Sequence, residues 1–179
     1  TMAMPARSPT ADEIIDALDF LRSEHERQFE FVNGYLQLSR ESQIESVFDS
    51  TDALISYLTV ELGLHHHDEE EDLFPILKEL CKIEDGIDHI LAELDRDHAV
   101  ENFLARIIVI DLKTIAAGKS LENPVRFILN FRAFAEGQVR HLIWENNIVL
   151  PLARERLGPV HLERMGQNIA ERRGMTAKD

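Results

Sequence analysis

The segment from His65 to Pro75 reads HHHDEEEDLFP and places three histidines directly before a run of acids. Imidazole and carboxylate groups four residues apart lie on the same face of an α-helix, where both can bind one metal ion. The pairs with that spacing are His65–Glu69, His66–Glu70 and His67–Glu71. The segment alone is therefore compatible with a metal site in any of three frames, or with a solvated run of charges.

A second segment, HLIWENNIVLP from His141 to Pro151, repeats the pattern and contains a single histidine. When the two segments are aligned by their prolines, His141 matches His65 and Glu145 matches Glu69. The apolar face of the surrounding helix pattern also continues through positions 65 and 69. The repeat therefore selects His65 and Glu69 as the inward pair of the first segment.

Two further histidines, His25 and His98, interrupt apolar helix faces upstream of the two segments. His25 precedes His65 by 40 residues and His98 precedes His141 by 43, so the chain reads as two equivalent helical hairpins. A lone inward histidine is usually a hydrogen-bonded core residue, but four of them with two buried glutamates require a neutralising cation. The sequence therefore predicts a metal site formed by His25, His65, Glu69, His98, His141 and Glu145.

These residues lie in a sequence whose apolar positions recur with the period of an α-helix. Thr10 and Glu13 form a capping-box pattern before the first helix, and Asn123-Pro124 is a typical start for the fourth. The sequence lacks β-branched alternation with hairpin turns, so strands are not expected. We predict one all-α domain over residues 1–179, an antiparallel four-helix bundle with helices at about 11–38, 44–83, 86–117 and 124–156 and a short C-terminal helix at about 160–172.

The bulk composition argues against several functional classes. A formal net charge of −14 disfavours nucleic acid as a partner, because phosphate binding needs clustered Lys and Arg. The single cysteine, Cys81, can form neither an internal disulfide nor a Cys/His zinc motif. Neither a secretory signal nor a stretch of about 18 apolar residues is visible, so we expect a cytoplasmic protein without a membrane-spanning segment.

The predicted ligand set is too large for one tetrahedral zinc ion, which takes four ligands. Four imidazoles and two carboxylates suit two first-row ions, each bound by two histidines and bridged by the glutamates. Iron accepts such a mixed nitrogen and oxygen set, although manganese, zinc or a mixed pair would accept much of it. The Glu-x-x-His pattern of ferritin-like bundles is absent, since here the histidine comes first and the spacing is four.

The chain resembles the hemerythrin-like (HHE cation-binding) family in four stretches that together span nearly its whole length. They are SEHERQF around His25, ELGLHHHDEEEDLFPIL, ELDRDHAVEN and FAEGQVRHLIWENNIVLPLARERL. The resemblance implies a four-helix bundle that holds two non-haem iron ions, bridged by carboxylate and by oxo or hydroxo groups. Members of the family handle O2, nitric oxide, peroxide or iron itself.

The sequence departs from the oxygen-carrying members of that family on the third helix. Those members have a fifth histidine one turn away from the position of His98, where this chain has Leu94 and Asn102. We therefore expect binding of, or reaction with, O2, nitric oxide or peroxide in sensing or detoxification rather than oxygen transport. The alternative is an iron-storage or iron-sensing module whose metal loading controls stability or partner binding. Catalase-, peroxidase- or nitric-oxide-reductase-like turnover and the protein partner are left open.

Other polar residues near the six are interpreted as surroundings of the site. We expect His66 and His67 to face solvent or to contact the ligands from outside, and the acids 70–72 to form a charged outer face. Gln138 is the best candidate for a hydrogen bond to a ligand. Glu101 either reaches the site or lies on the solvated flank of its helix.

Overall fold

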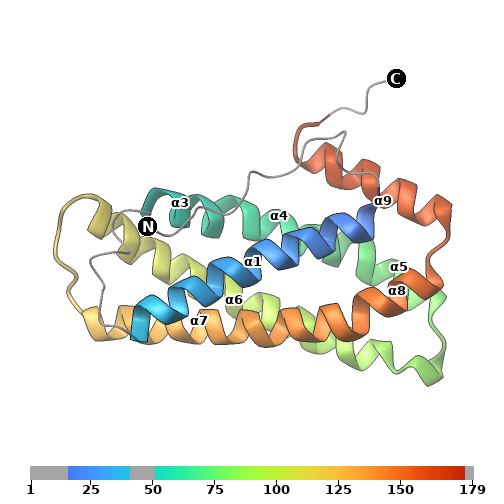
Figure 1. Ribbon diagram of the computed structural model, residues 1–179, viewed down its shortest axis with the longest axis horizontal. Helices are drawn as coiled ribbons and strands as arrows, with labels where there is room; N and C mark the ends of the chain where they lie inside the picture. The colour runs from blue at the N-terminus through green and yellow to red at the C-terminus, as the bar shows by residue number, and fades with distance from the viewer. Residues whose placement is uncertain (1–15, 41–50, 176–179) are drawn as a thin grey trace.

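The computed structural model describes residues 16–40 and 51–175, and helices make up almost all of this part of the chain. Four long helical segments run antiparallel to one another, and a shorter helix lies across one end of the bundle (Figure 1). These residues contain no strand, so the predicted all-α bundle is confirmed. Within the same two ranges, none of the helices combines the length and the apolar composition that crossing a membrane requires.

Two of the four long segments are continuous, namely α1 (Ala17–Arg40) and α6 (Ile87–Ala116). The second segment is divided, with π-helical parts marked η3 and η4, into α3 (Thr51–Ser56), η3 (Tyr57–Glu61), α4 (Leu62–His67), η4 (Asp68–Leu73) and α5 (Phe74–Leu80). The fourth consists of α7 (Pro124–Trp144), the π-helical η6 (Glu145–Val149) and α8 (Leu150–Arg156). The C-terminal helix is α9 (Pro159–Arg172). The Thr10–Glu13 capping box and the expected start near 44 lie outside the described residues. The first helix, expected from about 11, begins instead at Ala17, after Asp16, whose carboxylate accepts hydrogen bonds from the N–H groups of Leu18 and Asp19.

The second segment ends at Leu80 rather than near 83. Cys81 has an extended backbone with ψ at 150°, and a 3₁₀ turn, η5 (Ile83–Asp85), follows. The Asp85 carboxylate accepts a hydrogen bond from the Lys82 N–H at 2.8 Å, a local bond that competes with continuing the helix. Gly86 then adopts a left-handed conformation with φ at 64°, which glycine reaches without the steric cost of a Cβ.

Two of the π-helical segments, η4 and η6, lie directly before the matched prolines Pro75 and Pro151. Each closes with an N–H that binds the carbonyl five residues back, which belongs to Glu69 in η4 and to Glu145 in η6. Proline lacks an N–H but is tolerated in the first turn of a helix, so a new α-helical segment begins at each site. Both predicted glutamates therefore occupy equivalent π-helical turns.

Apolar side chains fill the bundle in two clusters that are separated along its long axis. One includes Leu21, Leu77 and Leu91, and the other includes Leu62 and Phe134. Burial of a side chain of this size contributes about 1.5–3 kcal/mol to folding. Each long segment passes from one cluster to the other, and the predicted ligands lie in the polar layer between them.

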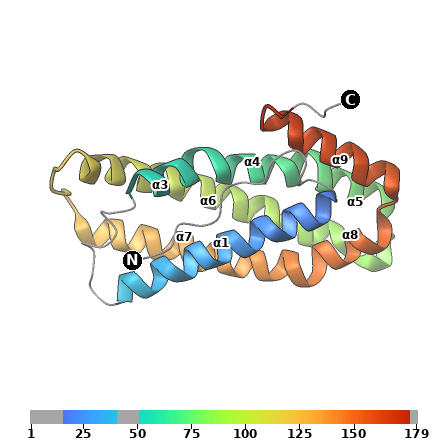
Figure 2. The ribbon, with the colours of Figure 1, turned by 45° about the horizontal axis from the view of Figure 1, so that its top comes forward.

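The short helix α9 packs against α1 and η4 at one end of the bundle (Figure 2). Its apolar face adds Met165 and Ile169 to the first apolar cluster, and both side chains are fully buried. Its last turn carries Arg172, and Arg173 caps the end of the helix. The helix thus covers the outside of a π-helical segment that carries a predicted ligand.

Candidate metal centre

Six side chains from four helical segments meet in the polar layer, and each is 0% exposed. They are His25 of α1, His65 of α4, Glu69 of η4, His98 of α6, His141 of α7 and Glu145 of η6. The structure therefore brings together all six residues that the repeat and the lone histidines predicted to lie together. Their role as metal ligands stays a prediction.

The first histidine pair, His25 and His65, faces one oxygen of each glutamate. His25 Nε2 lies 3.2 Å from Glu69 Oε1 and 3.3 Å from Glu145 Oε2. His65 Nε2 lies 3.5 Å from the same oxygen of Glu69. The ligand atoms of these four residues all lie within 4.8 Å of one another, which is compact enough for one ion.

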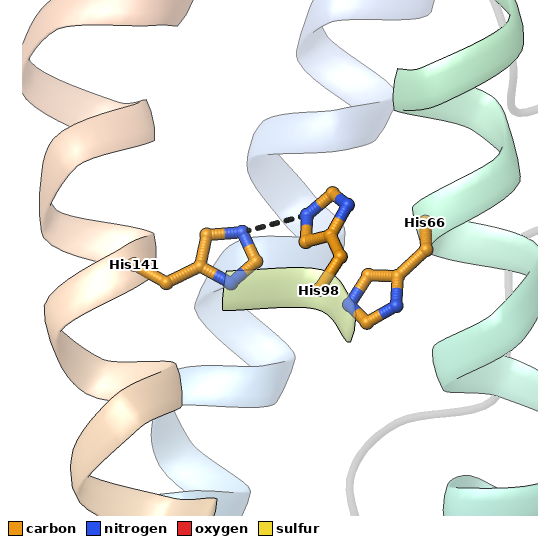
Figure 3. Close-up of side chains that lie close together, drawn as sticks. All are labelled: His66, His98 and His141. Carbon is orange, nitrogen blue, oxygen red and sulfur yellow. Dashed lines mark hydrogen bonds between the residues drawn. The ribbon is translucent and has the colours of Figure 1, made fainter. Parts of the chain in front are cut away.

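The second histidine pair, His98 and His141, faces the other oxygen of each glutamate. His98 Nε2 lies 3.3 Å from Glu69 Oε2, and His141 Nε2 lies 2.8 Å from Glu145 Oε1. The Nε2 atoms of the two rings are 3.1 Å apart (Figure 3). Each glutamate therefore directs one oxygen to each histidine pair, an arrangement that suits carboxylates shared between two ions.

The outer ring nitrogens of three histidines are held by polar side chains. The contacts are His25 Nδ1 to Asn146 Oδ1 at 2.8 Å, His98 Nδ1 to Glu70 Oε1 at 2.7 Å and His141 Nδ1 to Glu101 Oε1 at 2.8 Å. Because these oxygens accept, each Nδ1 donates, and in the neutral ring Nε2 presents its lone pair to the centre. Asn146 and Glu70 were not predicted as anchors, because each stands next to a stronger ligand candidate in the chain.

Several buried atoms of this layer have no hydrogen-bond partner among the described residues. They are both ring nitrogens of His65, Glu69 Oε2 and both carboxylate oxygens of Glu145. The imidazoles nearby are their nearest polar groups, and a divalent cation would satisfy the oxygens and the ring nitrogens together. The donor set therefore fits a first-row metal ion.

The pKa value of each histidine depends on whether the nearby carboxylates outweigh its burial. Burial disfavours the imidazolium form of His98, but the surrounding carboxylates, Glu145 first among them, raise its pKa to about 12. Burial lowers the pKa of His141, but the charges and hydrogen bonds of Glu145 and Glu101 together raise it well above its usual value. Burial lowers the pKa of His65 to about 3. A metal ion that binds the second pair must therefore displace protons.

His66 is buried in the wall of the site, whereas His67 is exposed, its side chain being 59% accessible. Of the two placements expected for His66, the structure selects contact with a ligand, since its ring stacks on His98 with centroids 3.9 Å and planes 14° apart. Burial lowers the pKa of His66. Consecutive positions differ by about 100° around a helix. His65 therefore contacts His25 of α1, while His66 contacts α6.

Of the three acids expected to form a charged outer face, Glu70 and Glu71 are exposed, whereas the prediction is wrong for Asp72. Glu71 is 58% exposed, as expected. Glu70 is 37% exposed and also binds His98 through one oxygen, whereas Asp72 is buried and accepts a hydrogen bond from Arg172 at 2.5 Å. Asp72 is buried because α9 packs against η4, which the local sequence does not reveal.

Glu101 reaches the site, one of the two placements that its spacing allowed. It is 2% exposed, and it binds His141 as described above. Gln138 does not hold a ligand, contrary to expectation. Its amide accepts a hydrogen bond from the Tyr57 hydroxyl at 3.1 Å and donates one to Gln28 at 3.2 Å. It therefore extends the polar layer by one turn.

Comparison with known proteins agrees with this geometry. The model of the hemerythrin HHE cation-binding domain family matches residues 16–153. A protein of Haemophilus influenzae described as uncharacterized is 24% identical over 147 residues, which is 82% of this chain and 80% of that protein. No solved structure matches the chain significantly. All six predicted ligands lie in the matched range, which ends before α9.

Proposed function

Since this chain belongs to the hemerythrin HHE cation-binding family, whose domains bind metal ions and typically iron, we propose that it is a non-haem di-iron protein. One ion is assigned to the first histidine pair and one to the second, with Glu69 and Glu145 shared between them. The proposal is supported by one observation: each of the two glutamates has one carboxylate oxygen next to the first histidine pair and the other oxygen next to the second pair. When bound, the ions would supply redox chemistry and a binding position for a small molecule.

We further propose that O2, nitric oxide or peroxide binds to or reacts with this centre, in sensing or detoxification. The polar layer lies between two apolar clusters, so small molecules of low charge are the ones expected to reach it. The acidic chain, with a formal net charge of −14, also supports a small-molecule rather than a nucleic-acid partner. Asn102 stands one turn after His98, so the third helix adds no further imidazole there.

The first experiment is elemental analysis of untagged protein, with metals quantified per chain. We expect about two irons per chain and a change in visible absorption when peroxide or nitric oxide is mixed with the iron-loaded protein. Zinc in place of iron, or one ion or none per chain, would contradict the di-iron proposal. Peroxide consumption no faster than that of free iron at equal concentration would restrict the role to binding.

Iron storage or sensing is the second candidate, and one observation favours it. Asp68 and Asp72 flank the shared Glu69 in η4, and both are ion-paired with arginines at the end of α9. Metal loading that stiffens η4 would then be transmitted to a helix on the outside of the bundle. Equal protease sensitivity of α9 in the iron-loaded and iron-free protein would argue against this role.

A further inference from the structure

His66 makes contacts that the six-residue site does not explain. Its side chain is 1% exposed, and its ring lies against His98, with His141 of α7 on the far side (Figure 3). The ring centroid of His66 lies 3.9 Å from that of His98 and 6.0 Å from that of His141, so a third imidazole adjoins the second histidine pair. Its distance to His65 of the first pair is 6.2 Å. The Nδ1 atom of His66 lies 3.2 Å from Asn102 Oδ1.

The contact with Asn102 determines which nitrogen of His66 carries the hydrogen. An amide oxygen can only accept, so Nδ1 of His66 donates to it, and Nε2 is the ring nitrogen left to bind a metal ion. That nitrogen lies 3.3 Å from Glu101 Oε2. Neither His66 Nε2 nor Glu101 Oε2 has a hydrogen-bond partner among the described residues, and both atoms are buried. Either a proton on Nε2 or a metal cation bound beside the pair would satisfy both buried atoms.

The neighbouring ligands indicate where that cation lies. Glu101 uses its other oxygen, Oε1, to hold His141, so its two oxygens connect His66 with the second histidine pair. The ligand atoms of His66, His98 and His141 all lie within 4.8 Å of one another. Nitrogens bound to one ion in a tetrahedral set are about 3.4 Å apart, given metal–nitrogen bonds of about 2.1 Å. Because a ring nitrogen binds a metal ion in the plane of its ring, shared binding with His98 requires the His66 ring to turn out of its stacked position.

We propose that His66 Nε2 is an additional metal ligand, which gives the second histidine pair a third imidazole and makes the two ion positions unequal. Glu101 acts as the positioning residue, with its carboxylate between His66 and His141. The inference rests on the proposed di-iron function. It predicts that the ion at the second pair is held more tightly than the ion at the first pair, and that this difference depends on His66.

The test compares the wild-type protein with His66→Phe, which keeps a ring against His98 but removes both nitrogens. His66→Ala is a second variant in case the larger ring does not fit, and His67→Ala is the matched control because that neighbour is exposed. The first readout is stepwise removal of iron by a competing chelator. The second is the NMR spectrum of the cobalt(II)-substituted protein, in which the ring N–H of each metal-bound imidazole gives a strongly shifted exchangeable resonance.

We expect both His66 variants to lose one ion at a chelator concentration at least about tenfold lower than wild type, and to lack one shifted N–H resonance. His67→Ala should match wild type in both readouts. If wild type and the His66 variants retain two ions equally well with the same resonances, the inference is wrong and the di-iron proposal stands. If wild type itself holds fewer than two ions, both are wrong. Circular dichroism of the metal-free proteins establishes that the variants fold.

Discussion

The buried carboxylate of Asp68 binds Arg173 through both of its oxygens, with Nη1–Oδ1 at 3.1 Å and Nη2–Oδ2 at 2.7 Å. Arg172 donates a further hydrogen bond to Asp68 Oδ1 at 2.8 Å. Asp68 is 0% exposed and directly precedes Glu69 in η4. The end of α9 is thus ion-paired with the segment that carries a shared glutamate, although the two are about a hundred residues apart in sequence.

Replacement of Arg173 should destabilise the fold through Asp68. In Arg173→Ala the buried carboxylate keeps only Arg172, so we expect the free energy of unfolding to fall by about 2–4 kcal/mol in urea denaturation. Arg154→Ala is the matched control, because Arg154 also binds two acids but is 46% exposed. It should cost less than about 1 kcal/mol. Equal losses in the two variants would show that burial of Asp68 is not what matters.

The frame of the first segment can be tested by comparing two neighbouring glutamates. Glu69→Ala removes a carboxylate that faces both histidine pairs, so we expect it to abolish occupancy by two ions. Glu71→Ala removes a side chain that is 58% exposed and should leave the metal content nearly unchanged. Metal content per chain after iron loading is the measurement. The reverse result would mean that the alignment of the two segments is wrong.

Removal of metal should lower the stability of the native state. Ions that bind only the folded protein stabilise it by linkage, by about 4 kcal/mol when free metal is 1,000 times its Kd. We expect a lower melting temperature after treatment with a chelator and full recovery when iron is returned. Identical melting curves with and without chelator would contradict a site that binds metal in the native state.

Metal affinity should fall as pH falls. The pKa of His98 is raised to about 12, so its ring is protonated at neutral pH, and iron must displace that proton in order to bind. The stability of the metal-free protein should change in the opposite direction. Because the pKa of His98 is higher in the folded than in the unfolded state, its protonation stabilises the fold. This contribution is complete when the pH is below the unfolded pKa of 6.5 and is lost as the pH rises toward 12. Chelator competition and urea unfolding between about pH 6.5 and 9 measure the two slopes. Slopes of the same sign would contradict the assignment.

The fold and the six-residue cluster could be predicted because both depend on patterns carried along the chain. A period of 3.6 residues places His65 and Glu69 on one helix face, and the second segment with its single histidine removes the choice between frames. The same pattern places His25 and His98 on inward faces. Residues that lie at one level of an antiparallel bundle then meet, because each helical segment returns alongside its predecessor.

The surroundings of the cluster were decided only by the tertiary structure. His66 is one position from His65 and points to a different neighbour, so its burial depends on α6 lying beside α4. Asp72 looks exposed in its own segment and is buried because α9 packs over η4. Periodicity reports which way a side chain points from its own helix. Which helix or charge it meets depends on packing between segments distant in sequence, and short-range patterns do not contain that information.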